Sequence, residues 1–226
     1  MRHFLEELEE LQQRLLEMGG LVESAISNSV LALSERSETR ARQVLNNEAR
    51  INQMEIEIDD CAVRLLALQQ PMARDLRFLT AAIKINSDLE RMGDLAVNIV
   101  ERALSLMKQA QVKPLIDIPK LAQLSESMVH KSLDAFVRRD AELARQVLLS
   151  DDAVDDLRDA IYEELVSFME KDRSTISRSL DLIFVARHLE RIADHATNIA
   201  EDVVFLVKGI DVRHRAPEDA DLGVAG

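Results

Sequence analysis

The chain has 226 residues, of which 28 are Lys or Arg and 41 are Asp or Glu, so its formal net charge is −13. This charge opposes binding to nucleic acid and to anionic lipid, because both depend on Lys and Arg. Apolar residues make up 47% of the chain, enough for a hydrophobic core, while six Gly and four Pro allow few turns. With 3% aromatic residues, a β-sandwich is disfavoured. The composition predicts an all-α fold of long helices.

The apolar segments of the chain are all too short or too charged for a membrane span, which needs roughly 18 uncharged apolar residues. The first residues, MRHFLEELEE, also lack the hydrophobic region of a signal peptide. The single cysteine, Cys61, excludes an intramolecular disulfide, and we expect it to be a small buried residue. These observations predict a cytoplasmic protein without direct membrane insertion.

Apolar residues recur at three- and four-residue spacings along nearly the whole chain, which predicts six helices. The first helix contains Gly19–Gly20, which either kinks it or leaves it intact. Ser37 suits the N-cap of the second helix, and Asp172 or Ser174 that of the sixth. Residues 209–226 are aperiodic, which predicts a disordered tail. The expected helices cover residues 3–34, 38–69, 72–110, 117–138, 140–170 and 173–208.

A repeated motif indicates that the six helices arose as two sets of three. Residues 88–101 read DLERMGDLAVNIVE and residues 188–201 read HLERIADHATNIAE, which are identical at eight of 14 positions at an offset of 100. Upstream, residues 48–54 align with residues 151–157 at an offset of 103. We therefore expect one three-helix repeat over residues 1–112 and a second over residues 113–208.

The motif places oxygen-bearing side chains in a line along one face of a helix. At 100° per residue, with Glu90 taken as zero, Asp94 lies near 40°, Asn98 near 80° and Glu101 near 20°. The apolar residues of the motif fall on the opposite side, where a core would lie. The second copy repeats this stripe with Glu190, Asp194, Asn198 and Glu201.

A solvated surface is the simpler interpretation of either stripe alone, but it fits the pair less well. Solubility does not require the same carboxylates and amide at the same spacings twice, and like charges four residues apart repel. A hard cation such as Mg²⁺, Mn²⁺ or ferric iron would replace this repulsion by coordination. Asp151 and Asp155 are suitably placed to add ligands from the neighbouring helix, and their first-copy counterparts are Glu48 and Asn52.

Two further residue types lie near the stripes. His188 and His195 flank the second stripe, but they have no histidine counterparts in the first, so we interpret them as boundary residues in preference to metal ligands. Arg91 and Arg191 follow the motif glutamates and either pair with nearby acids or contact a partner.

The repeated motifs resemble the doubled Glu/Asp-x-x-x-Asp signature of the PhoU family. Residues 66–77, LALQQPMARDLR, and the opening FLEEL at residues 4–8 resemble that family as well. The resemblance implies two three-helix bundles related by pseudo-symmetry, with multinuclear metal clusters on the acidic motifs. Glu48 and Asn52 depart from the motif by one carboxylate, so the second copy is expected to bind metal more strongly. The residues that match it are Glu90, Asp94, Glu190, Asp194, Asp151 and Asp155.

The resemblance also implies a function. Members of the family restrain the phosphate-specific ABC transporter and the phosphate-responsive histidine kinase, so the expected partners are the transporter's ATPase subunit and the kinase. We expect a homodimeric, non-enzymatic adaptor that binds metal ions (iron, zinc, manganese or magnesium). The alternative is a carboxylate-bridged metalloenzyme or metal store, although the Glu-x-x-His pattern of ferritin-like bundles is missing from the helices.

Overall fold

The structure, a computed structural model, describes residues 2–69 and 71–213, without the side chains of residues 2 and 69. These residues contain no strand, and none of their helices is long and apolar enough to cross a membrane. The all-α prediction is therefore confirmed. The elements are α1 (Arg2–Glu35), α2 (Glu38–Gln69), α3 (Ala73–Met107), α4 (Asp117–Arg138), α5 (Ala141–Leu148), α6 (Asp151–Lys171), the short 3₁₀ helix η1 (Arg173–Thr175) and α7 (Ile176–Lys208).

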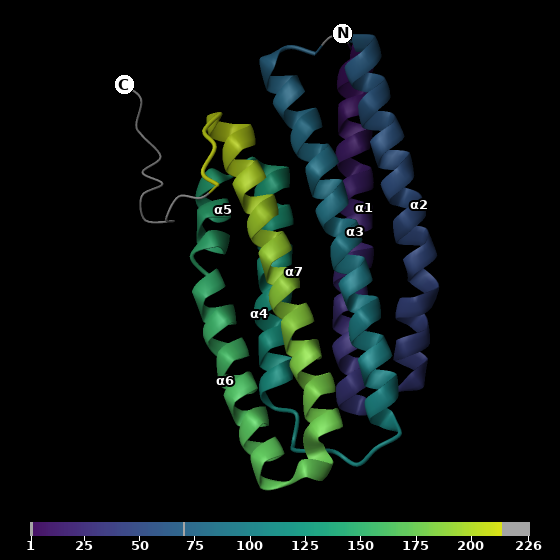
Figure 1. Ribbon diagram of the computed structural model, residues 1–226. Coiled ribbons are helices and arrows are strands. Elements are labelled where there is room, and N and C mark those ends of the chain that lie inside the picture. The colour runs from purple at the N-terminus through teal and green to yellow at the C-terminus, as the bar shows by residue number, and fades with distance from the viewer. Residues whose placement is uncertain (1, 70, 214–226) are drawn as a thin grey trace.

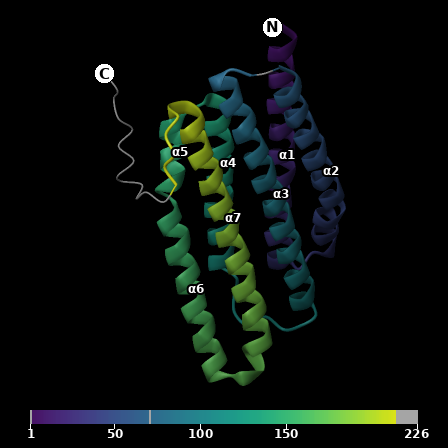
Figure 2. The ribbon, with the colours of Figure 1, turned by 45° about the horizontal axis from the view of Figure 1, so that its top comes forward.

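The helices form two units that lie side by side (Figures 1 and 2). The first unit contains α1, α2 and α3, and the second contains α4, α5, α6 and α7. The units meet where α3 packs against α7 and α1 packs against α4. In Figure 1, α3 runs downward and α7 runs upward, so the two helices that carry the repeated motif are antiparallel. The predicted duplication of an up-down three-helix unit is thereby confirmed.

One hydrophobic core extends through both units, and its residues come from all seven α-helices. The repeated motif contributes at equivalent positions: Leu89 and Met92 on α3, like Leu189 and Ile192 on α7, have no exposed surface. Because these residues recur at helical spacing, each helix turns one apolar face inward and leaves its acidic face outward. The core therefore fixes which side of α3 and α7 carries the acidic stripes.

Of the two possibilities for Gly19–Gly20, the structure has the uninterrupted helix. A Cβ atom on Gly19 would lie 2.6 Å from Cδ1 of Leu133 on α4, whereas a Cβ on Gly20 would meet nothing within 4 Å. Gly19 thus permits the close approach of α1 to α4 that joins the two units. Gly20 has no comparable packing role.

The predicted fifth helix, residues 140–170, is wrong as one continuous element. It divides at Leu149–Ser150 into α5 and α6. Asp140 caps α5, because its carboxylate accepts hydrogen bonds from the backbone N–H groups of Glu142 at 2.9 Å and Leu143 at 3.0 Å. The hydroxyl of Ser150 turns back to donate to the carbonyl of Gln146 at 2.8 Å, which satisfies a free carbonyl at the end of α5. Asp151 then begins α6, where a carboxylate complements the helix dipole.

The first interhelical turn of each unit has the same backbone conformation. Arg36 and Arg139, which are 103 residues apart, both have φ of 53°. The guanidinium of Arg36 donates to the carbonyls of Met107 and Gln109, so it caps the end of α3. Arg139 has a different role, because its guanidinium lies 5.8 Å from the centre of the Phe78 ring. The duplication kept the turn and changed the contact.

The linker and the C-terminal segment are both anchored to the helices. Lys113 is buried in the linker, where its ammonium pairs with Asp117 at 3.3 Å and with Glu164 of α6. Gly209 ends α7 with a positive φ of 71°. The predicted disordered tail lies largely outside the described residues, which end at 213, and within the described part Val212 is buried.

Candidate functional site

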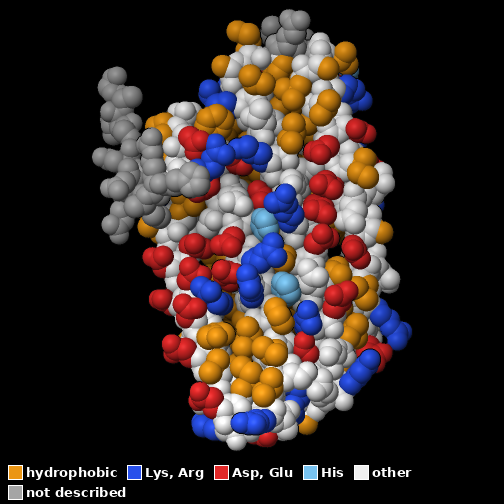
Figure 3. Space-filling view, in the orientation of Figure 1, with side chains coloured by type: hydrophobic (Ala, Val, Ile, Leu, Met, Phe, Trp, Pro, Cys, Tyr) orange, Lys and Arg blue, Asp and Glu red, His pale blue; other side chains and the backbone are white. Residues whose placement is uncertain are grey.

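Both acidic stripes lie on the surface formed by α3 and α7. Glu90 and Glu190 are half-buried, whereas Asp94 and Asp194 are exposed, so the stripes face away from the core. In Figure 3, acidic side chains gather on both sides of this face, and a line of basic and histidine side chains separates them. The structure therefore offers two acidic regions, one in each unit, with a positively charged strip between them.

In the first unit, the stripe combines with carboxylates of α2 to form a cluster, here named the first acidic cluster (Glu55, Asp59, Glu90 and Asp94). Burial raises the pKa of Glu90, and the charges of Asp94 and Glu55 raise it further. Burial likewise raises the pKa of Glu55, with Asp59 and Asp94 adding to the shift. Asn86 of α3 ties the cluster to α2, because its amide donates to the Glu55 carbonyl and to an Asp59 carboxylate oxygen, each at 2.9 Å.

In the second unit, the predicted approach of α6 to the stripe is found, which gives the second acidic cluster (Asp151, Asp155, Glu190 and Asp194). The pKa of Asp151 is raised to about 6, first by burial and then by the charges of Asp194 and Asp155. Burial also raises the pKa values of Glu190 and Asp194. Unlike the first cluster, this one has an internal cation: the Arg158 guanidinium lies 3.0 Å from Asp155.

Sequence reasoning placed both stripes on the outward faces of α3 and α7, where they lie in the structure, but it missed part of the first cluster. The α2 carboxylate that raises the pKa of Glu90 is Glu55, and Glu48 does not contribute. A signal was available, because Glu55 and Asp59 have the same four-residue spacing as the motif itself. The aligned position of Glu55 at an offset of 103 is Arg158, so the units differ in charge where they correspond in position.

The outer residues of each predicted stripe lie farther along the helices. Asn198 donates toward Asp88 of α3 at 3.4 Å, and Glu201 lines a shallow hollow with Lys84 and Arg91. Asn98 is half-buried and Glu101 is exposed. Among the described residues, no three His, Cys, Asp or Glu side chains already converge as a metal-binding set. Any cation bound here would therefore have to draw the carboxylates of a cluster inward.

The two histidines have different environments between the clusters. His195 is buried, and its Nδ1 lies 2.8 Å from a carboxylate oxygen of Asp88, so the pair joins α7 to α3. His188 occupies the position equivalent to Asp88, but its buried Nδ1 has no hydrogen-bond partner. Burial and then the neighbouring charges of Arg191 and Arg102 lower the pKa of His188 to about 4. His188 is therefore neutral at physiological pH.

Pairs of charged and aromatic residues continue along the α3–α7 contact. The ammonium of Lys84 lies 2.7 Å from Asp202, and the guanidinium of Arg102 lies 3.2 Å from Asp181. Arg102 also lies 4.8 Å from the centre of the Phe184 ring. Position 184 is the repeat of position 84. The ion pair of Lys84 in the first unit therefore corresponds to the cation–π contact of Phe184 in the second. These contacts hold the two acidic clusters at a fixed separation.

The chemistry of the clusters is that of cation binding. Their donors are carboxylate oxygens, which suit hard cations more than soft ones. Burial raises the pKa values of these carboxylates most, the charges of neighbouring carboxylates raise them further, and a divalent cation would oppose both effects. The clusters thus fit a metal ion by donor type and charge.

The fold agrees with that of known proteins. The model of the PhoU domain matches residues 15–103 and 118–203, one match in each unit. The chain belongs to the PhoU family. It is 43% identical to the phosphate-specific transport system accessory protein PhoU homolog of Pseudomonas putida, over 94% of this chain and 84% of the relative. It is 35% identical to the PhoU protein of Escherichia coli strain K12, over 99% of this chain and 92% of the relative.

Solved PhoU structures resemble the whole double bundle. The crystal structure of PhoU from Pseudomonas aeruginosa has a TM-score of 0.89 and 42% identity, and covers 92% of this chain and all of that chain. The crystal structure of the phosphate transport system regulatory protein PhoU from Streptococcus pneumoniae has a TM-score of 0.85 and 33% identity, over 92% of this chain and 99% of that chain. The second acidic cluster therefore lies in a fold that PhoU proteins share.

Proposed function

We propose that this protein is a cytoplasmic regulator of phosphate homeostasis, acting as an adaptor without enzymatic activity. It restrains the phosphate-specific ABC transporter through the ATPase subunit, and it restrains the phosphate-responsive histidine kinase. The observation that carries this proposal is the match over nearly the whole chain to proteins named phosphate-specific transport system accessory protein. The bipartite acidic face supports an adaptor role, because charged surfaces with distinct patterns discriminate between protein partners.

A deletion strain tests the regulatory role. Loss of the protein should raise expression of phosphate-scavenging genes in medium with abundant phosphate, because the restraint on the kinase is gone. The measurement is a reporter fusion to a phosphate-responsive promoter, with a plasmid copy of the wild-type gene as the control. Repression indistinguishable from that of the wild-type strain would show that this protein is not such a regulator.

We further propose that the two acidic clusters bind metal ions. The support is the donor set and the raised pKa values of Glu90, Glu190 and Asp151, to which burial contributes most and the charges of neighbouring carboxylates add. From sequence alone, the second copy was expected to bind more strongly. Because Glu55 adds a carboxylate to the first cluster and Arg158 adds a positive charge to the second, we now expect the first cluster to bind more strongly.

Paired substitutions test this proposal. Glu90→Gln with Asp94→Asn, and separately Glu190→Gln with Asp194→Asn, should remove bound metal without disturbing the core. Elemental analysis of the purified protein gives the metal content, and melting curves with Mn²⁺ or with chelator give its effect. A ligand at 100 times its dissociation constant stabilises the folded state by about 2.7 kcal/mol. Equal metal content in both variants and in the wild type would exclude these clusters as the metal sites.

A further inference from the structure

The contact between α3 and α7 contains two equivalent places, because the helices are antiparallel and carry the same motif (Figure 1). At the first place, a carboxylate oxygen of Asp88 lies 2.8 Å from Nδ1 of His195 and accepts from the amide of Asn198 at 3.4 Å. In the repeat, His188 stands at the position of Asp88, and Leu95 stands at the position of His195. The second place therefore lacks the carboxylate on which the first is built.

Three arginines surround the second place, which we name the His188 site (Arg102, Arg187, His188 and Arg191). Their charges all act on the imidazole of His188. Arg102 pairs with Asp181, 3.2 Å away. Arg187 and Arg191 are exposed, and neither forms an ion pair or hydrogen bond with a residue that the structure describes. Two positive charges at this site are therefore without a direct partner.

The first place has no such surplus of positive charge. Lys84 pairs with Asp202 at 2.7 Å, and Asp88 and Arg91 line the same hollow as this pair. The repeat positions of the two acids carry arginine in place of Asp202 and histidine in place of Asp88. The duplicated contact thus has two fewer carboxylates on one side than on the other.

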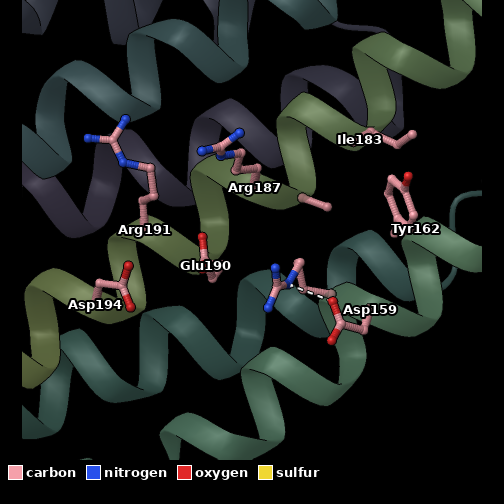
Figure 4. A pocket seen from close by; sticks show the side chains of 9 residues that line it. Asp159, Tyr162, Ile183, Arg187, Glu190, Arg191 and Asp194 are labelled. Carbon is pink, nitrogen blue, oxygen red and sulfur yellow. Dashed lines mark ion pairs between the residues drawn. The ribbon is translucent and has the colours of Figure 1, made fainter.

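The two free guanidinium groups are open to solution, because a groove of about 630 Å³ lies beside them between α6 and α7 (Figure 4). Ala186 leaves this groove open, whereas its repeat, Asn86, has no exposed surface and bridges α3 to α2 in the first unit. In Figure 4, Arg187 and Arg191 extend to the same side of α7, away from Tyr162. At four residues apart they are separated by about 6 Å along the helix, so one small ion can contact both.

The neighbouring carboxylates limit which anion fits the site. Glu190 and Asp194 are close enough to Arg187 and Arg191 to interact with their charges. An extended polyanion would contact these carboxylates and be repelled, whereas a compact anion can remain among the guanidinium groups and His188. A phosphoryl group is compact, and it carries close to two negative charges at neutral pH. Its oxygens also match the planar fork of a guanidinium group.

We propose that the His188 site binds a small oxyanion with two negative charges, of the phosphoryl type. The oxygens of the anion accept hydrogen bonds from Arg187 and Arg191. The anion also supplies an acceptor to the imidazole of His188, whose Nδ1 has no hydrogen-bond partner. It thereby takes the role that the carboxylate of Asp88 has at the first place. The site goes beyond the proposed function, because it follows from the unequal residues of the two repeats.

Calorimetric titration of the full-length protein with inorganic phosphate tests this proposal. Chelator keeps metal ions out of the acidic clusters, and NaCl holds the ionic strength constant. Arg187→Gln and Arg191→Gln each remove one charge-assisted contact at an exposed position, so each should weaken binding about tenfold. The matched control is Arg91→Gln at the repeat position of Arg191, which should bind as the wild type does. His188→Asp places a carboxylate in the site itself and should abolish binding.

A second titration, with adenosine monophosphate, distinguishes free phosphate from a phosphoryl group on a larger molecule. Binding of either probe that falls in both Arg187→Gln and Arg191→Gln supports the site, and the tighter probe identifies the source. Unchanged affinity in both variants, an equal loss in Arg91→Gln, or no binding of either probe by the wild-type protein would overturn it. None of these results alters the regulatory function, which the deletion strain tests separately.

Discussion

The two units share a backbone plan but differ in the space between their outer helices. In the first unit, Asn86 joins α3 to α2, and Glu55 adds a carboxylate to the acidic cluster. In the second unit, Ala186 leaves a groove at the same place, and Arg158 adds a positive charge. The comparison shows that a duplicated core can be kept while the surface between the helices changes in shape and charge.

The difference between the clusters has an electrostatic consequence. All the α2 groups in the first cluster are carboxylates, and the charge of Arg91 only partly offsets the rise in the pKa values of Glu55 and Glu90. In the second cluster, Arg158 already lies 3.0 Å from Asp155 and 3.2 Å from Asp159. If the clusters bind cations as proposed, we therefore expect the first cluster to bind them more strongly than the second.

We expect the largest difference in stability between equivalent positions at the contact of α3 with α7, which joins the two units. Asp88→Ala leaves His195 buried without its partner, so the free energy of unfolding should fall by about 2–4 kcal/mol. His188→Ala at the repeat position should cost much less, because the Nδ1 of His188 has no partner to lose. Urea denaturation monitored by circular dichroism measures both. Equal losses would show that the Asp88–His195 pair adds nothing to the joining of the units.

The two equivalent turns should respond differently to the same substitution. Arg36→Ala removes the hydrogen bonds that cap α3, and because these are exposed to water the expected loss is about 1 kcal/mol. Arg139→Ala removes an exposed contact with the Phe78 ring, worth about 0.5 kcal/mol. Alanine keeps the cost of the positive φ in both turns, so the comparison isolates the side chain. The melting temperatures of the two variants check this expectation: Arg36→Ala should be lowered more than Arg139→Ala.

The smallest effect concerns pH and the second cluster. The folded state raises the pKa of Asp151 from 3.8 to about 6, so the unfolded chain releases this proton first as pH rises. The wild-type protein therefore loses stability between pH 4 and pH 6, and the loss is complete above pH 6. Asp151→Asn removes this pH-dependent loss, so the free energy of unfolding should rise by about 0.5–1 kcal/mol at pH 7.5, after discounting for solvent screening.

Melting curves in chelator at pH 3.5 and pH 7.5 check this expectation. The advantage of Asp151→Asn should be near zero at the lower pH and complete at the higher one. Asp156→Asn, on the exposed side of the same helix, serves as the control and should show no comparable gain. A gain of equal size at both pH values would mean that the effect does not arise from the ionisation of Asp151.

Residue spacing was sufficient to predict most of the fold and the position of both stripes. The spacing of Leu89 and Met92 locates the core face, and Glu90 and Asp94 then have to lie outside. Spacing gives no information on how one helix is rotated against its neighbour, which explains why Glu55 was missed and Glu48 was chosen. The break at Ser150 was also missed, because no Gly or Pro marks it and the side chain that ends α5 is a common serine.

The groove was beyond prediction for a related reason. The exchange of Asn86 for Ala186 is a modest change in sequence, and its meaning depends on which atoms of α2 or α6 lie opposite. Only the structure shows that the Asn86 amide lies 2.9 Å from two acceptors on α2. A comparison of the two repeats, residue by residue, would have marked positions 86 and 186 as different without giving the reason.

The close fit of α1 against α4 at Gly19 and Leu133 also affects how the protein is made. The first unit emerges from the ribosome before α4 and α7 have been synthesised. The surfaces of α1 and α3 that later pack against these helices therefore face water during synthesis. At about 5–20 residues per second, the second unit follows roughly ten seconds later. During that interval the nascent first unit has an uncovered apolar side, which is the kind of surface that chaperones bind. Completion of the chain, more than folding of either half, is the event that yields a finished molecule.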